Sequence, residues 1–269
     1  MGNFLFKEEQ DISNDFNKNG YVIKSINNIN SLDYIKNKII KIIKKKINLK
    51  KKINDNYLLN NIHKFVKVKD LNNFRLAVIN DINSDNLFRS HYYKISRPYL
   101  DHIVGNELAM QIKINLSIQF PNDDSSLLAT HADTWSGDSP YEAVVWLPLV
   151  NCYKTKAMYL LPPKETKKIQ ENFSKRKLDN SEKLYRHIKK KVKWIDIDYG
   201  EVLIFDQAMP HGNRINLEKE TRWSFNCRFK SLFSPYGDKK LGEFFEIQSL
   251  KPASSVALNY EFPEFKKNG

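Results

Sequence analysis

The chain has 269 residues, 41% of them hydrophobic and 12% aromatic, which is enough to bury the core of one folded domain and excludes a disordered chain. Its net charge of +13 comes from 44 basic and 31 acidic residues. The lysines are spread among asparagines and isoleucines, as in 41–54, so the charge indicates a compositional bias and does not by itself predict a nucleic-acid partner.

The sequence shows no feature that would place the chain outside the cytoplasm. Its two cysteines, Cys152 and Cys227, form no CxxC motif and cannot build a disulfide framework. The N-terminus has no apolar segment of signal-peptide length, and no stretch reaches the roughly 18 uncharged apolar residues of a membrane span. We therefore expect a cytoplasmic protein with no membrane partner and a single domain over 1–269.

The first part of the chain, 1–105, is expected to form a helical flank. Ser31 is a candidate N-cap for a helix with one apolar stripe, made of Leu32, Ile35, Ile39, Ile42, Ile43 and Ile47. A second helical stretch is expected over 69–105, interrupted at Pro98 because proline lacks the amide proton that a helix interior needs.

Beyond Gly105 the pattern changes to a period of two, which is typical of strands. Residues 111–120 alternate strictly between polar and apolar side chains. Further strands are expected over 142–149, 157–161, 191–197, 201–206 and 222–229. These short strands predict a mainly β core with helices, a sandwich or barrel over 106–232.

Two segments interrupt or follow this core. The charged segment 163–190 has a helical composition and lies between two predicted strands, so it is either a surface insertion or a lid over a site. Residues 233–269 contain scattered prolines and aromatic residues and are expected to be an irregular C-terminal extension.

Three residues combine into a candidate metal site. His131 and Asp133 follow a strand predicted over 127–130, and alternation places both side chains on one side of it. His211 follows the strand 201–206. Two histidines and one carboxylate form the facial triad of non-haem iron oxygenases, which leaves three positions open, two for a keto acid and one for dioxygen. Each histidine alone would more often be structural.

Arg222 begins an alternating strand with two contrasting faces. Trp223, Phe225, Cys227 and Phe229 share one face, which we expect to pack under the N-terminal helices. Arg222, Ser224, Asn226 and Arg228 share the other and would then point into the barrel. A guanidinium inside a barrel needs an anion, and the distal carboxylate of 2-oxoglutarate would supply one, with Ser224 as a further donor.

The strand 111–120 and one loop supply further candidates. Gln111, Lys113 and Asn115 share a face that we place inward, with Gln111 and Asn115 near the cosubstrate and Lys113 near the substrate; an outward orientation remains open. The loop 134–141 offers Trp135 as a stacking surface. We also expect Asn226 and the cations Lys113 and Arg228 to bind the substrate. A stacking surface beside positive charge predicts a polar, anionic, carbohydrate-type substrate, such as a nucleotide-linked or phosphorylated sugar.

Taken together, these motifs resemble a known superfamily. The order H-A-D (131–133), V-V-W-L-P-L (144–149), A-M-Y-L-L-P-P (157–163), G-E-V-L-I-F-D (200–206), P-H-G-N (210–213) and R-W-S (222–224) is similar to that of phytanoyl-CoA dioxygenase-like oxygenases. In particular it resembles bacterial iron(II)/2-oxoglutarate oxygenases encoded among carbohydrate-biosynthesis genes. Many members have a Gly-Ser-His turn where this chain has Pro163-Lys164-Glu165, so substrate roles of that turn do not carry over.

The resemblance implies a double-stranded β-helix, or jelly-roll, core. It also implies that Fe(II) binds His131, Asp133 and His211, that 2-oxoglutarate binds Arg222, and that Trp146 lies beside the cosubstrate. The expected function is hydroxylation of a small molecule with O2, although desaturation, cyclisation or epimerisation would use the same site. Two alternatives remain, a cupin-like isomerase or lyase that does not use 2-oxoglutarate and a non-catalytic polyanion-binding protein.

Overall fold

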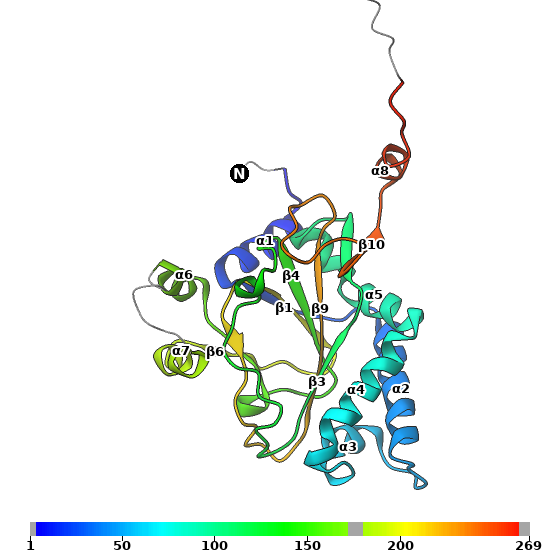
Figure 1. The fold of residues 1–269 in the computed structure, drawn as a ribbon, viewed down its shortest axis with the longest axis vertical. Helices are drawn as coiled ribbons and strands as arrows, with labels where there is room; N and C mark the ends of the chain where they lie inside the picture. The colour runs from blue at the N-terminus through cyan, green and yellow to red at the C-terminus, as the bar shows by residue number, and fades with distance from the viewer. Residues whose placement is uncertain (1–3, 172–179, 264–269) are drawn as a thin grey trace, which may run out of the picture.

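The computed structural model describes residues 4–171 and 180–263, and its centre is an antiparallel sheet (Figure 1). This seven-stranded sheet has the order β1-β7-β4-β9-β2-β10, and β3 pairs with β9 beside that path. Strand β9 therefore forms ladders with β4, β2 and β3. The strands are β1 (Tyr21–Ser25), β2 (Leu108–Gln111), β3 (Asn115–Gln119), β4 (Glu142–Pro148), β7 (Glu201–Asp206), β9 (Arg222–Ser231) and β10 (Phe245–Ser249).

Most helices of the N-terminal part gather on one side of this sheet, as Figure 1 shows. The apolar face of β9 packs beneath them, as predicted: the ring of Trp223 meets Phe74, and the ring of Phe225 meets Phe88. The indole nitrogen of Trp223 also donates to the Leu59 carbonyl. The helices are α1 (Lys7–Asn19), α2 (Ile29–Lys46), α3 (Asp55–Asn60), α4 (Leu71–Asn83) and α5 (Asn86–Ile103), with short 3₁₀ turns η1 (Ile62–Lys64) and η2 (Val68–Asp70).

The boundaries of these helices differ from the prediction, and the stretch expected over 69–105 is divided into α4 and α5 at 84–85 and not at Pro98. Helix α2 begins after Asn28, whose side chain accepts from the Ser31 amide, so Ser31 lies inside the helix and is not its cap. Helix α5 continues through Pro98. This proline lies on the exposed face, where water can solvate the carbonyl group that loses its donor.

Several predicted strand assignments were wrong. The stretch 111–120 is two strands, because the Asn83 side chain donates to the Ile114 carbonyl and accepts from its amide between them. Residues 127–130 form no strand. The N-terminal flank contributes β1, which pairs with β7, and the C-terminal extension contributes β10, which pairs with β2. These edge strands were missed because their pairing partners are distant in sequence.

A smaller three-stranded sheet lies apart from the first and has the order β6-β5-β8. Next to it, α6 and α7 pack around a separate apolar cluster that includes Leu161, Ile169 and Leu184. Residues 172–179 of the predicted insertion 163–190 lie outside the described residues. The remaining elements are β5 (Tyr159–Leu160), β6 (Lys193–Trp194), β8 (His211–Gly212), α6 (Pro163–Glu171), α7 (Ser181–Ile188), α8 (Pro252–Ala257), η3 (Asp133–Ser136) and η4 (Lys154–Lys156).

Within the described parts of the chain, the helices are too short or too polar to cross a lipid bilayer.

Candidate metal centre and active-site cavity

His131 and His211 are brought together by the backbone. His131 forms an isolated antiparallel bridge with His211, in which each amide donates to the other residue's carbonyl, at 3.0 and 2.7 Å. Two residues further on, the Asp133 amide donates to the Gln207 carbonyl at 3.0 Å, at the start of η3. These three backbone bonds hold the candidate ligands in one place, although they come from distant parts of the sequence.

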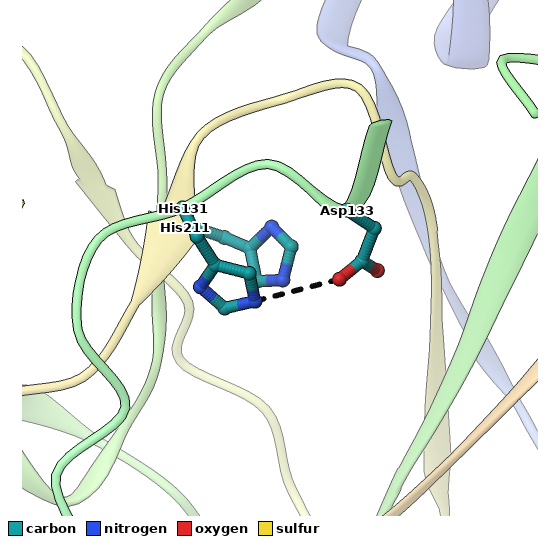
Figure 2. Close-up of side chains that lie close together, drawn as sticks. All are labelled: His131, Asp133 and His211. Atoms are coloured by element: carbon teal, nitrogen blue, oxygen red, sulfur yellow. Dashed lines mark ion pairs between the residues drawn. The ribbon is translucent and has the colours of Figure 1, made fainter. Parts of the chain in front are cut away.

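The three side chains converge on one point, as Figure 2 shows. One potential ligand atom from each of His131, Asp133 and His211 lies within 4.8 Å of the others, a spacing that a single metal ion can bridge. The Nε2 atom of His131 is 3.4 Å from Oδ1 of Asp133, the contact dashed in Figure 2. The structure thus brings the predicted triad together.

Hydrogen bonds orient both imidazole rings. Nδ1 of His131 lies 2.8 Å from the Ala129 carbonyl oxygen, and Nδ1 of His211 lies 2.9 Å from that of Met209. A carbonyl oxygen only accepts, so each Nδ1 carries a proton. Nε2 of His211 then presents a lone pair to the centre, whereas Nε2 of His131 donates to the Asp133 carboxylate. A proton on Nδ1 that bonds a carbonyl group is the arrangement that metal-binding histidines require.

Two of the three candidate ligands have the protonation state that suits a metal. Burial lowers the pKa of His211 to about 4, and repulsion from His131 adds to this, so the ring is neutral at pH 7. Burial would raise the pKa of Asp133, but its bond with His131 and the charges around it outweigh burial and hold that pKa well below its usual range. An ionised carboxylate and a neutral imidazole are the forms that bind a cation. Burial would lower the pKa of the third, His131, but its hydrogen bond with Asp133 outweighs burial and raises that pKa, so a metal would have to displace this proton.

Arg228 connects the metal centre to a buried polar network. Its Nη2 lies 2.9 Å from Oδ1 of Asp133, and its Nε donates to Gln207 at 3.1 Å. Behind it, Lys239 pairs with Asp138, which is 3.8 Å from the same Arg228 nitrogen. Sequence reasoning missed Gln207 and Lys239, because no local pattern indicates which residues will join a distant ion pair.

The triad lies in a cavity of about 740 Å³ with walls from both sheets. Its volume is within the range of small-molecule sites. The large sheet contributes side chains from β3, β4, β7 and β9, and the small sheet contributes β8. Lining residues on the inner walls include Ser117, Val144, Met158, Phe205, Gly212 and Asn213.

Arg222 lines the same cavity, and none of the described residues is an anionic partner for it. The side chain is 3% exposed and donates to the Ala157 carbonyl and to Ser117 Oγ, at 3.3 and 3.0 Å. Its Nε, like the buried Oγ of Ser224 beside it, makes no hydrogen bond. Within residues 4–171 and 180–263, no carboxylate forms an ion pair with this guanidinium, whose pKa burial lowers to about 10. A buried cation of this kind predicts a bound anion.

Three more predicted residues form one row across neighbouring strands. Asn226 of β9 is in register with Asn115 of β3 on one side and with Trp146 of β4 on the other. Asn115 donates to Asn226 at 3.0 Å, and all three line the cavity. Ser117, which had not been chosen as a site residue, lies on the same inner face and could have been found from the same alternation.

The other predicted residues lie elsewhere. Lys113 is exposed in the break between β2 and β3, so the prediction that it faces inward was wrong. Gln111 does not line the cavity; its Oε1 accepts from the Arg228 amide at 3.2 Å. Trp135 is 39% exposed and is not part of the cavity wall. The alternation failed for Lys113 because the strand is broken at 112–114.

The described residues of 163–190 also lie away from the cavity wall. Helices α6 and α7 bury their apolar residues against each other and Leu161. Of the two interpretations of this segment, the described helices favour the surface insertion over the lid.

Comparisons with known proteins agree with this architecture at the level of fold. No protein-family model matches the chain, and no curated protein matches it. Among solved structures, it is similar to the non-heme monooxygenase ThoJ in its apo form, with 14% identity and a TM-score of 0.50 over 89% of this chain and 84% of that one. It is also similar to HygX from Streptomyces hygroscopicus with nickel and 2-oxoglutarate bound, with 11% identity and a TM-score of 0.50 over 88% and 90% of the two chains.

A further similar structure is EvdMO1, with 11% identity and a TM-score of 0.54 over 83% of this chain and 50% of that one. Identities this low show a shared fold, and the chemistry has to be argued from the residues of the site.

Proposed function

We propose that this chain is a non-haem iron(II) oxygenase that uses 2-oxoglutarate as cosubstrate and O2 as oxidant. The observation that carries the proposal is one cavity that holds both a His-Asp-His cluster and a buried guanidinium with no anionic partner among the described residues. The first feature binds a metal, and the second binds a carboxylate.

The donor set fits iron(II). His131 and His211 supply imidazole nitrogens, and Asp133 supplies a carboxylate oxygen. Among the described residues, no cysteine belongs to this ligand cluster. Three protein ligands leave positions open for other molecules, unlike the closed coordination of structural zinc sites. When bound, the iron and 2-oxoglutarate would supply the oxidising power for attack on a C–H bond. The HygX structure of the same fold holds nickel and 2-oxoglutarate, which supports the proposed cofactors.

The protein's own groups would hold the cosubstrate in place. Nε of Arg222 and Oγ of Ser224 are unpaired polar atoms of residues that line the cavity, and both can donate to a carboxylate. Asn115 and Trp146 line the same cavity and are proposed as further cosubstrate contacts. Apolar side chains such as Phe205 and Met158 limit the access of water to this region.

We extend the proposal to the fold and the substrate class. Two antiparallel sheets that enclose one cavity support a jelly-roll core. The polar lining, including Asn226, Ser125 and Ser126, suits a hydroxyl-rich, carbohydrate-type substrate. We propose hydroxylation as the reaction. A cupin-like isomerase or lyase is not favoured, because it would leave the buried Arg222 without a function.

Succinate formation tests the proposal. Purified protein is given Fe(II), 2-oxoglutarate and O2, and succinate is measured with a panel of sugars, sugar nucleotides and acyl thioesters. We expect iron-dependent succinate that rises with the correct substrate. His211→Ala should abolish it, and Arg222→Leu should raise the 2-oxoglutarate concentration for half-maximal rate roughly tenfold or more, because a buried charge-assisted pair is lost.

Arg186→Leu is the matched control, since Arg186 is 73% exposed and pairs with Glu182 on α7. Wild-type protein that binds iron and forms no succinate would contradict the proposal. So would an Arg222→Leu variant with unchanged dependence on 2-oxoglutarate.

A further inference from the structure

One wall of the cavity comes from the N-terminal helical flank, which sequence reasoning left without a function. The turn η2 and the first part of α4 contribute Val68, Lys69, Leu71, Asn72 and Arg75 to the same cavity as the metal triad. Leu71 and Arg75 are four residues apart on α4 and lie on one helical face, and Val68, Lys69 and Asn72 line the cavity beside them. This wall carries two cations and two apolar side chains toward the cavity.

Arg75 is fixed in position beside β3. Its Nη1 donates to the Leu116 carbonyl at 3.3 Å, and its Nη2 donates to Asn72 Oδ1 at 2.9 Å. The side chain is half-buried. In the part of the chain that the structure describes, neither Arg75 nor Lys69 has a carboxylate within ion-pair distance. The guanidinium is therefore held over the cavity wall by neutral acceptors, and its charge remains available.

The charges of the cavity wall do not balance. Its described residues include four cations, Lys69, Arg75, Arg222 and Arg228, and one carboxylate, Asp133. Arg228 pairs with Asp133. Arg222 lies buried on β9 and is assigned to the cosubstrate. Lys69 and Arg75, on a separate wall, remain without an anion, and together they carry the charge that a phosphate dianion would neutralise.

We propose that the primary substrate carries a phosphate group that binds Lys69, Asn72 and Arg75, while the part to be oxidised extends toward the metal triad. The assignment of this ligand as the substrate rests on the proposed oxygenase function. Val68, Leu71 and, from another part of the wall, Leu127 and Leu128 contact the neutral part of the molecule. The wall formed by η2 and the first part of α4 thus determines the specificity for the substrate.

Titration of metal-free protein with inorganic phosphate, followed by ³¹P NMR at low ionic strength, tests the anion site directly. We expect saturable binding, weakened roughly tenfold in Arg75→Gln and in Lys69→Gln, because each removes a charge-assisted hydrogen bond. Lys113→Gln is the matched control, since Lys113 is exposed outside the cavity, and it should bind as the wild type does. Binding of 2-oxoglutarate to the nickel-loaded protein, measured on the same variants, should be unchanged.

The outcomes separate this inference from the proposed function. The inference would be overturned if phosphate did not bind, or if it bound equally to Arg75→Gln, Lys69→Gln and Lys113→Gln. Loss of phosphate binding only in Arg222→Leu would overturn it as well, even if 2-oxoglutarate binds normally. If acetate binds as tightly as phosphate, the assignment to phosphate is wrong. If phosphate binding depends on Arg75 and 2-oxoglutarate does not bind, the anion site stands and the oxygenase proposal fails.

Discussion

At the scale of single residues, the same local geometry occurs at both histidines of the triad. Each ring directs its Nδ1 to the carbonyl two residues earlier, that of Ala129 for His131 and that of Met209 for His211. The backbone of the same strand-like segment therefore sets the orientation of each ring. The centre is preorganised before any metal binds, which lowers the conformational entropy cost of binding.

Replacing Arg228 should lower the stability of the metal-free protein but increase the stabilisation that a bound metal gives. Arg228→Met leaves the buried Asp133 carboxylate without its cation and should lower the free energy of unfolding of the metal-free protein by about 3 kcal/mol. The same change removes a positive charge that competes with a metal for Asp133 Oδ1. Nickel should therefore raise the melting temperature more in Arg228→Met than in the wild type, which thermal unfolding with and without nickel measures.

Lys239→Met is the control for this prediction, because Lys239 pairs with Asp138 and not with a triad residue. It should lower stability without increasing the shift that nickel causes. An equal nickel shift in wild type and Arg228→Met would show that Arg228 does not act on the metal centre.

At the scale of elements, β9 organises the molecule. Its apolar face packs against helices α4 and α5, while its polar face carries Arg222, Ser224, Asn226 and Arg228 along the cavity. At its C-terminal end, Lys230 is 0% exposed, and its ammonium donates to the carbonyls of Ser231 and Ser234. The strand therefore buries cations that water would otherwise solvate.

Lys230 should make stability depend on alkaline pH. Burial lowers its pKa in the folded state to about 8, from 10.5, so between these values the unfolded chain binds more protons than the folded one. Stability then rises with pH, because the cost of the buried charge is complete below pH 8 and disappears as the ammonium deprotonates. The free energy of unfolding of the wild type, relative to Lys230→Met, should rise by about 2 kcal/mol between pH 7.5 and 10.

Urea unfolding at a series of pH values measures this difference, and the comparison with Lys230→Met cancels the titration of other groups. A difference that stays constant, or that falls with rising pH, would show that Lys230 keeps its ordinary pKa in the folded protein.

At the scale of the whole molecule, one apolar core joins the helical flank to both sheets. It contains Cys227 on β9 and Cys152, whose backbone bridges to Ile197 near the small sheet. Both thiols are at most 1% exposed. Since they lie in different parts of the core, they report on whether this core opens as one unit.

Both cysteines should be unreactive until the protein unfolds. Burial raises the pKa of each thiol to about 12, so neither forms the reactive thiolate at pH 8 in the folded state. With a thiol-specific disulfide reagent, we expect no labelling of native protein and complete labelling in denaturant. The labelling rates of Cys152→Ser and Cys227→Ser, each with one thiol left, should show the same dependence on urea. Rapid labelling of either one under native conditions would contradict a single cooperative core.

The triad, Arg222 and the two faces of β9 could be predicted from the sequence by itself. Their signals are local, because alternation follows from the backbone geometry of a strand and the motifs around His131 and His211 need only neighbouring residues. The structure brings all three triad residues together and places Arg222 in the same cavity. The helical character of the flank and most of the core strands were predicted for the same reason.

Tertiary structure alone decided the rest. Asn83, distant in sequence, breaks the strand at Ile114 and leaves Lys113 in water, and the partners of β1 and β10 depend on the whole sheet. Which cation is neutralised is likewise a matter of packing: Arg228 meets Asp133, whereas Arg222 and Arg75 meet no carboxylate among the described residues. Local patterns set the face on which a side chain lies, but electrostatic pairing depends on long-range contacts, which only the folded chain creates.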